Sequence, residues 1–205
     1  MYTPQEFRIE DRDVLFSLMA RHNFATLVTV QDGAPAASHV PFIVQPDVGE
    51  NGTLVAHLAR ANGQWQTLRG EQEALVIFQG PHAYVSPSWY ETHPSVPTWN
   101  YMTVHVRGKP KLIEAEAGVR RILGDLVSQH EEAGSGWTLE GAEGYVEKMW
   151  RRIVAFESAI SSIEGKFKLS QNRDETDRRN VAAALSASND PSVQQLSKAM
   201  QGFSL

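Results

Sequence analysis

The amino-acid sequence predicts an α+β, mainly β fold: an antiparallel β-barrel with peripheral helices and a helical C-terminal tail. Strand-like segments follow one another at hairpin spacing through the first half of the chain, separated by clusters of turn residues. The regular alternation of strands and helices that a parallel Rossmann sheet requires does not occur there. Apolar stripes at helical spacing are concentrated in the second half.

Six segments are expected to form strands: Phe24–Val30, Ala36–Val44, Thr53–Ala59, Ala74–Gln79, Thr103–Lys109 and Ile153–Ile163. The turn residues Gln31–Gly33 predict a hairpin between the first two. Ala74–Gln79 is a nearly continuous apolar run, which is typical of a strand buried on both faces. Thr103–Lys109 alternates between apolar and polar residues, as a half-buried strand does.

Helices are expected around these strands. Asp11 or Asp13 can cap a first helix, and an apolar stripe from Val119 to His130 predicts a long amphipathic one. Further helices are expected at Asn62–Arg69, around Ala142–Trp150, after Asp174 and from Pro191, where Asp190 can act as the N-cap. We therefore predict a barrel domain at residues 1–173 with a helical insertion at 115–150, followed by a helical tail at 174–205.

The composition is that of a globular protein. Hydrophobic residues make up 41% of the chain and charged residues 21%, so a sizeable core can be buried. No apolar run approaches the roughly 20 residues of a membrane helix, and the first residues lack the apolar region of a secretory signal. We therefore expect a cytoplasmic protein with no membrane partner. The net charge of −5 gives no support to DNA binding, although DNA stays a possible partner through a local basic patch.

Motif searches exclude several kinds of site. The chain has no cysteine, which excludes disulfides and thiolate chemistry. Its seven histidines show no metal-ligand spacing, so no metal is expected. Neither a GxGxxG motif, a Walker lysine loop nor a GxSxG elbow occurs. No catalytic residue is assigned.

Three segments are candidates for a binding site. His57–Trp65 places a strand end before a short helix, where free N–H groups and Arg60 could hold an anion; a capped surface helix is the alternative. Gly80–Tyr101 gathers aromatic rings in a proline-rich loop, which could stack on a planar ligand, form a subunit interface or pack into its own core. Lys166–Arg173 offers basic and polar side chains, or a solvated strand end.

Four blocks of sequence, taken together, resemble a known family. They are AHLARANGQW at 56–65, FQGPHAYVSPSWY at 78–90, VPTWNYMTVHVRG at 96–108 and EGKFKLSQNR at 164–173. They are similar to the PaiB-type family of FMN-binding negative transcriptional regulators, and the resemblance covers nearly the whole chain. The family is similar to the split-barrel flavoproteins, which include pyridoxamine phosphate oxidases and flavin reductases. The resemblance therefore implies an FMN-binding split β-barrel at residues 1–173 and a homodimer with FMN at the interface.

The resemblance also implies which residues contact FMN. The phosphate is expected at the end of the third strand and the following turn, and the isoalloxazine ring along the second strand. The residues implied at the phosphate are His57, Leu58, Ala59, Arg60, Asn62 and Gln64, and those along the ring are Ser38, His39, Val40 and Pro41. Trp99, Asn100 and Tyr101 are expected to line the ring or the partner subunit's side, with Lys168, Gln171 and Asn172 as additional contributors.

Three functions stay open at this point. The family name implies a ligand-responsive negative transcriptional regulator. A flavin-dependent oxidoreductase, such as an FMN reductase or a pyridoxamine-phosphate-oxidase-like enzyme, is the first alternative, since the flavin itself carries redox chemistry. A non-catalytic dimeric interaction module is the second.

Overall fold

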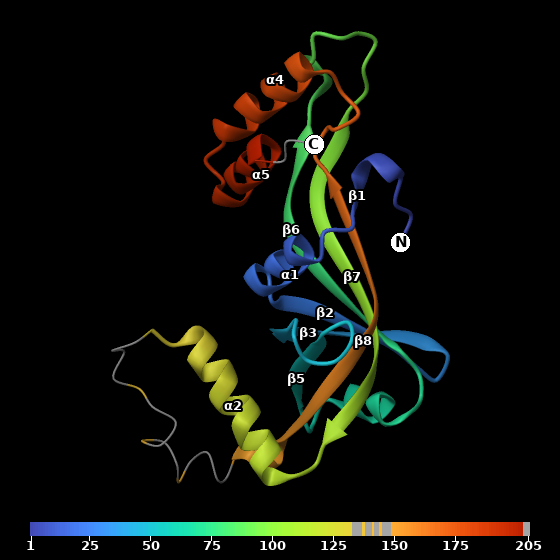
Figure 1. The fold of residues 1–205 in the computed structure, drawn as a ribbon, viewed down its shortest axis with the longest axis vertical. Helices are drawn as coiled ribbons and strands as arrows, with labels where there is room; N and C mark the ends of the chain where they lie inside the picture. Colours follow the sequence, from blue (N-terminus) through green and yellow to red (C-terminus); the bar gives the residue numbers. More distant parts are fainter. Residues whose placement is uncertain (133–136, 138–140, 142–143, 145–148, 203–205) are drawn as a thin grey trace. The chain divides into compact units, whose positions relative to one another are not determined.

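The structure is a computed structural model that describes residues 1–132, 137, 141, 144 and 149–202. Its strands are β1 (Arg8–Ile9), β2 (Phe24–Gln31), β3 (Ala34–Pro41), β4 (Ile43–Gln45), β5 (Thr53–Ala59), β6 (Ala74–Val85), β7 (Thr98–Ile113) and β8 (Ile153–Lys168) (Figure 1). Its helices are α1 (Arg12–Arg21), α2 (Glu116–His130), α4 (Glu175–Ser186) and α5 (Pro191–Gly202). Short 3-10 helices are η1 (Gln5–Phe7), η2 (Gly63–Arg69), η3 (Pro87–Trp89) and η5 (Trp150–Arg152).

The strands follow the order β3-β2-β6-β7-β8-β5-β4, and β1 pairs with β8. The registered pairs, such as β2 with β3 and β5 with β8, are antiparallel. The expected hairpin at Gln31–Gly33 is confirmed, because Asp32 and Gly33 both adopt the positive φ angles that a tight turn between strands requires. Helices flank the strands, so the predicted antiparallel, mainly β architecture is confirmed.

The chain divides into two compact units. The first contains residues 1–18, 79–105 and 164–205, and the second contains residues 19–78 and 106–163. Strands β6, β7 and β8 each contribute residues to both units.

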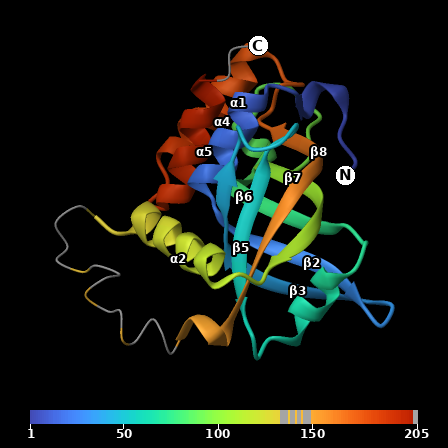
Figure 2. The ribbon, with the colours of Figure 1, turned by 60° about the horizontal axis from the view of Figure 1, so that its bottom comes forward.

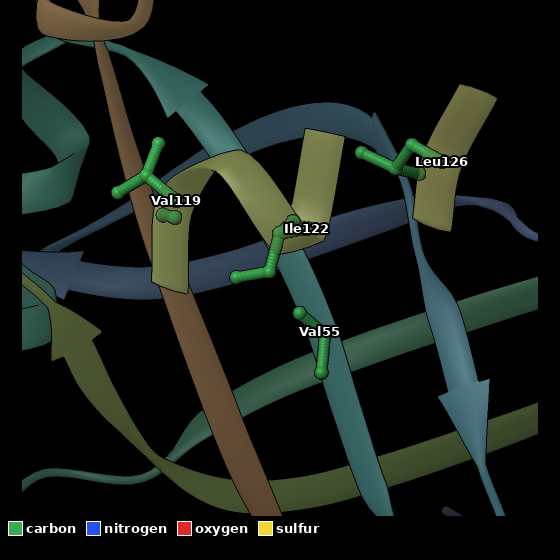
Figure 3. Close-up of a cluster of buried hydrophobic side chains, with 5 residues drawn as sticks. Val55, Val119, Ile122 and Leu126 are labelled. Atoms are coloured by element: carbon green, nitrogen blue, oxygen red, sulfur yellow. The ribbon is translucent and has the colours of Figure 1, made fainter. Parts of the chain in front are cut away.

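The core of the second unit includes one face of α2. Val119, Ile122 and Leu126 of this helix are buried against Val55 of β5 and Ala155 of β8 (Figure 3). Figure 2 shows α2 running beside β5. Full burial of one such aliphatic side chain is worth about 1.5–3 kcal/mol, so this stripe fixes the helix on the sheet. The predicted amphipathic helix is confirmed.

The first unit contains the paired helices α4 and α5, which Figure 1 shows side by side. The hydroxyl of Ser197 on α5 donates to the carbonyl oxygen of Ala182 on α4 at 2.7 Å. Asp174 caps α4 by accepting the N–H of Asp177 at 2.8 Å. Asp177 in turn accepts the N–H of Glu91 at 2.7 Å, which ties the loop after η3 to the helix. Both expected C-terminal helices are confirmed.

The first expected helix is confirmed as α1, and the choice of its cap is settled. Asp11 accepts the N–H groups of Asp13 and Val14, at 3.0 and 3.1 Å, so Asp11 is the capping residue. The helix expected around Ala142–Trp150 lies largely outside the described residues.

Two expectations about strand length were wrong. The strand expected at Ala36–Val44 is interrupted at Phe42, which is fully buried with its ring 5.8 Å from that of Phe78 and 6.2 Å from that of Phe156. The aromatic segment Gly80–Tyr101 is a loop only in its middle, because β6 continues to Val85 and β7 begins at Thr98. Burial of the large Phe42 ring outweighs unbroken pairing in the first case.

Candidate functional site

In the second unit, the turn after β5 is joined to the β2–β3 hairpin by Asn62. The Asn62 side-chain oxygen accepts the N–H of Gln64 at 3.1 Å and thereby caps η2. Its side-chain nitrogen donates to the hydroxyl of Ser38 on β3 at 2.8 Å. The structure therefore brings together two residues expected at opposite ends of one ligand. One donor and the acceptor of the Asn62 amide are thereby engaged in positioning the turn.

Gln64 extends the same connection into the interior. Its side chain is buried, and its Nε2 donates to the carbonyl oxygens of Leu27 and Ala36, at 3.2 and 3.0 Å, and to the Thr29 hydroxyl at 3.1 Å. Its Oε1 is buried and accepts no hydrogen bond from the residues that the structure describes. Gln64 therefore fixes η2 against the hairpin, and its predicted contact with FMN stays a prediction.

Arg60 follows β5 and holds the segment before β8. Its Nε donates to the carbonyl oxygen of Arg151 at 2.9 Å, and its Nη2 donates to that of Ile153 at 3.0 Å. The guanidinium carbon lies 5.8 Å from the centre of the Trp65 ring, and that of Arg69 lies 4.7 Å from it. These three side chains line one end of a pocket of about 200 Å³. Arg60 and Arg69 bring two positive charges to this pocket beside an aromatic ring, and Glu114, which also lines it, brings one negative charge.

His57 lies within β5, between the buried Ala56 and Leu58, and Ala59 ends the strand. Its Nδ1 is buried and has no hydrogen-bond partner among the described residues. Burial lowers the pKa of His57 below its ordinary value. The imidazole is therefore neutral near pH 7 and supplies no positive charge for a phosphate.

The expected ring-facing residues lie together on β3. His39 is exposed, and its Nδ1 is 3.0 Å from the hydroxyl of Thr26 on β2. Its ring lies 6.4 Å from that of Phe24, whose surface is 68% exposed. Val40 is buried, whereas Ser38 and Pro41 are half-buried. The exposed His39 and Phe24 rings therefore give this part of the hairpin a partly aromatic surface.

In the first unit, the three consecutive residues Trp99, Asn100 and Tyr101 have different environments. Trp99 is exposed, and Asn100 is fully buried. The Asn100 side-chain nitrogen donates to the Ser170 hydroxyl at 2.9 Å and contacts the Met200 sulfur at 3.6 Å. Tyr101 is half-buried, with the Lys166 ammonium 5.4 Å from its ring centre. Asn100 therefore connects β7 to the C-terminal segment. Of the three residues, Trp99 and Tyr101 have aromatic rings on which a ligand could stack.

The end of β8 carries a cluster of basic side chains. Burial lowers the pKa of Lys168, and the nearby charges of Lys166 and Arg173 lower it further. Lys168 donates to the Thr98 hydroxyl, and Arg173 donates to the Ser95 hydroxyl at 3.2 Å. These hydroxyl partners are neutral, and Asp174 is the acidic group that interacts with Arg173. A bound anion would relieve the repulsion that the cations still exert on Lys168.

Gln171 and Asn172, the two remaining residues expected to contact FMN, follow this cluster in the sequence and differ in how far their side chains are already hydrogen-bonded. Gln171 folds back on its own turn, accepting the N–H of Leu169 and donating to the carbonyl oxygen of Phe167, both at 2.6 Å. Its amide is therefore occupied by the backbone. Asn172 is exposed.

Comparison with known families decides the class of protein. Residues 1–162 match the family model described as "Putative FMN-binding domain". The chain belongs to this FMN-binding family. This confirms the resemblance on which the flavin site was predicted and the choice of FMN as its cofactor.

Individual proteins similar to this FMN-binding family member agree with this assignment. The chain is 33% identical over 203 residues to the Bacillus subtilis "Protease synthase and sporulation protein PAI 2", covering 98% of this chain and 97% of that protein. Its structure resembles the flavocytochrome Anf3 from Azotobacter vinelandii, with a TM-score of 0.60, 14% identity and coverage of 84% and 75% of the two chains. The structure also resembles a FAD and heme binding protein from Mycobacterium smegmatis, with a TM-score of 0.57 and 18% identity. The match covers 86% of this chain and 79% of that protein. The fold is the antiparallel split β-barrel.

The residues present fit a flavin phosphate in both units. Each unit contains a cluster of cations with few acidic neighbours: Arg60 and Arg69 in the second, where Glu114 lines the same pocket, and Lys166, Lys168 and Arg173 in the first, where Asp174 interacts with Arg173. Arginine and lysine are the side chains that hold phosphate groups. FMN is therefore compatible with the chemistry of these side chains.

Arg69 is a candidate that the sequence did not reveal. It ends η2 and reaches the same ring as Arg60 nine residues earlier. A basic residue in the last turn of a helix is usually read as satisfying the helix dipole. Only the position of Trp65 between the two arginines in the sequence could have indicated a shared contact. Among the described residues no group of three histidine or acidic side chains could hold a metal ion.

Proposed function

We propose that this protein is a homodimeric FMN-binding protein that acts as a ligand-responsive negative regulator of transcription. One observation carries the proposal: the match along 98% of this chain to a protein named for protease synthase and sporulation. A match over both full lengths includes the C-terminal helices, which lie beyond the FMN-binding family model. This coverage supports assigning the proposed regulatory function to the whole chain and not to the barrel alone.

The proposed flavin position follows from the charged and partly aromatic surfaces of the second unit. Arg60 and Arg69 would hold the phosphate, and the face of β3 from Ser38 to Pro41 would pass the isoalloxazine ring. Asn62 and Gln64 keep these two parts in register through their hydrogen bonds to the hairpin. When bound, FMN supplies reversible one- or two-electron redox chemistry.

The proposed dimer accounts for the apolar surface of β2 and β3. Strand β3 is at one end of the strand order, and Phe24 and Val30 on β2 have 68% and 53% of their surfaces exposed. Exposed edge strands such as β3 tend to pair or to be covered in native proteins, and exposed apolar side chains on the neighbouring β2 are typical of an interaction surface. A second copy of this chain is the covering partner that the split-barrel resemblance implies.

DNA contact, if it occurs, has weak electrostatic support in this chain. Helix α4 carries Arg178 and Arg179 against Glu175 and Asp177, and Lys198 is the basic residue of α5. A balanced surface gains little from the release of counterions, which supplies most non-specific DNA affinity. We therefore propose that regulation depends on the ligand state of the dimer, with DNA contact confined to a specific site or a partner protein.

Three measurements on the full-length protein test this function. The purified protein should show flavin absorbance after FMN is added, and its mass in solution should be that of a dimer. A labelled fragment from upstream of its own gene should shift in a salt- and FMN-dependent way. Loss of every shift at low salt, together with steady oxidation of a reduced nicotinamide, would replace regulation with the oxidoreductase alternative.

A further inference from the structure

A pocket of the first unit lies between its aromatic segment and its C-terminal helices. It has a volume of about 460 Å³, within the range of roughly 300–1,000 Å³ of small-molecule sites. Rings from β6, η3 and β7 line one side: His82, Tyr84, Trp89 and Trp99. The end of α4, the following connection and the start of α5 line the other. None of these elements belongs to the Arg60–Arg69 cluster.

The aromatic side of this pocket is a set of rings in mutual contact that stays open to solvent. The Trp99 ring centre lies 6.2 Å from that of His82 and 6.1 Å from that of Tyr84, with the Tyr84 ring edge-on. Trp99 and Tyr84 leave 54% and 47% of their surfaces exposed. Leaving such large rings uncovered forgoes the free energy of burial, which a ligand would recover. Their electron-rich faces favour a positively charged ligand.

The charged groups of the pocket point to the same ligand. Asp190 is its single acidic residue, and no lysine or arginine is found among the described lining residues. One Asp190 oxygen accepts the N–H of Ser192 at 2.8 Å and caps α5. The full negative charge of this carboxylate exceeds the partial charge of about +0.5 at a helix N-terminus. The pocket is therefore lined by one carboxylate, and it lacks the lysine and arginine side chains that usually hold a phosphate or carboxylate ligand.

We propose that this pocket binds a small organic cation, with its ammonium group over the Trp99 face and its charge balanced by Asp190. The ligand and the charged residue differ from those of the flavin position proposed above, whereas Trp99 is also a residue that the family resemblance implies for FMN, so the experiment includes FMN as a competitor. An organic cation bound between β7 and the α4–α5 connection would also give the regulator an input that is separate from FMN. The site would then act by fixing the C-terminal helices to the aromatic segment.

Choline and 3,3-dimethylbutan-1-ol are the matched probes, since they have the same shape and differ in charge. Binding is measured on the full chain by saturation-transfer difference NMR, with and without saturating FMN. Choline should bind at least about fivefold more tightly than the alcohol, as expected for a cation over aromatic rings. Equal affinities for the two probes, or displacement of choline by FMN, would overturn the proposal; displacement would assign the pocket to the flavin ring.

Two variants locate the cation. Asp190→Asn keeps a capping side chain at the start of α5 and should weaken choline about threefold or more while leaving the alcohol unchanged. Asp11→Asn removes a charge from the cap of α1 in the same unit and is the matched control. Trp99→Leu should abolish choline binding, and its exposed position makes loss of the fold an unexpected result. Equal losses in the two aspartate variants, or unchanged binding in Trp99→Leu, would contradict the assignment.

Discussion

The side-chain nitrogen of Asn62 donates a hydrogen bond to the Ser38 hydroxyl across 2.8 Å, joining the turn after β5 to strand β3. These residues are 24 positions apart in the sequence. The bond fixes the proposed phosphate end of the site relative to the proposed ring end. We expect Ser38→Ala to lower the free energy of unfolding by about 0.5–1.5 kcal/mol and to weaken FMN binding at the same time. Urea unfolding and FMN titration measure the two effects. If Ser38→Ala has the stability and the FMN affinity of the wild type, the hydrogen bond between Asn62 and Ser38 does not position the site.

Arg60 and Arg69 should contribute differently to FMN binding and to stability. Arg60→Ala removes two hydrogen bonds to backbone carbonyls as well as a charge, so both stability and FMN affinity should fall, the latter by about 1.5–3 kcal/mol. Arg69→Gln should reduce FMN affinity alone. The exposed Arg107→Gln in the same unit is the control, and FMN fluorescence titration is the measurement. Unchanged affinity in both variants, with a loss in Lys168→Met, would move the phosphate to the end of β8.

The buried Gln64 should contribute more to the free energy of unfolding than the exposed Gln66. Gln64→Leu leaves the carbonyl oxygens of Leu27 and Ala36 without this donor, which we expect to cost about 1–3 kcal/mol of unfolding free energy. Gln66→Leu makes the same chemical change at an exposed position of η2 and should cost less than about 0.5 kcal/mol. The urea concentrations at the unfolding midpoints of the two variants measure this difference in stability. Equal midpoints would mean that the buried contacts of Gln64 are not stabilising.

These contacts show how far the sequence could predict the site. Local signals were sufficient for the Asn62–Arg69 helix and for the hairpin at Gln31–Gly33, because capping and turn formation depend on neighbouring residues. The partners of Arg60 lie more than 90 positions away, at Arg151 and Ile153, and no local pattern indicates them. A residue type that suits a phosphate can equally hold two backbone carbonyls. The sequence therefore located the turn but not the roles of its side chains.

The strand boundaries show the same limit. Gly80 lies inside β6, although glycine is a common sign of a loop. A Cβ atom there would lie 3.1 Å from the Leu18 side chain and 3.2 Å from Met102. The close approach of two other segments, and not a turn, favours glycine at this position. Such an approach depends on tertiary packing, so the aromatic segment could not be divided correctly into strand and loop from its composition.

Gly80→Ala should consequently destabilise the first unit. The added methyl group must displace Leu18 or the Met102 backbone, and overpacking of this kind costs about 1–3 kcal/mol. Gly63→Ala is the matched control, because no atom lies within 4 Å of its added Cβ. Thermal unfolding of the two variants gives the comparison. A melting temperature of Gly80→Ala no lower than that of Gly63→Ala would show that the contacts around Gly80 are loose.

The cap of α4 should make stability depend on pH in the acid range. Hydrogen bonds from the Asp177 N–H and then from the Thr92 hydroxyl hold the pKa of Asp174 below its ordinary value of 3.8. A lowered carboxyl pKa stabilises the folded state above pH 3.8, and this stabilisation is lost as the pH falls through the folded-state value. The difference in unfolding free energy between wild type and Asp174→Ala should therefore be constant at neutral pH and shrink below about pH 4. A difference that does not change with pH would show that the charge of the cap is irrelevant.

His57 should produce a second pH dependence, closer to neutrality. Burial lowers the pKa of His57 below 6.5, so the unfolded chain takes up a proton at this position before the folded protein does. Stability is then fully present above pH 6.5 and decreases as the pH falls through the interval between the unfolded and folded values. His57→Leu has no group to protonate and should unfold with a shallower dependence between about pH 7 and 5. His93→Gln, which removes an exposed imidazole, is the control. If wild type and His57→Leu lose stability in parallel over this range, the buried imidazole is not neutral in the folded protein, and His57 becomes a candidate for pairing with the flavin phosphate after all.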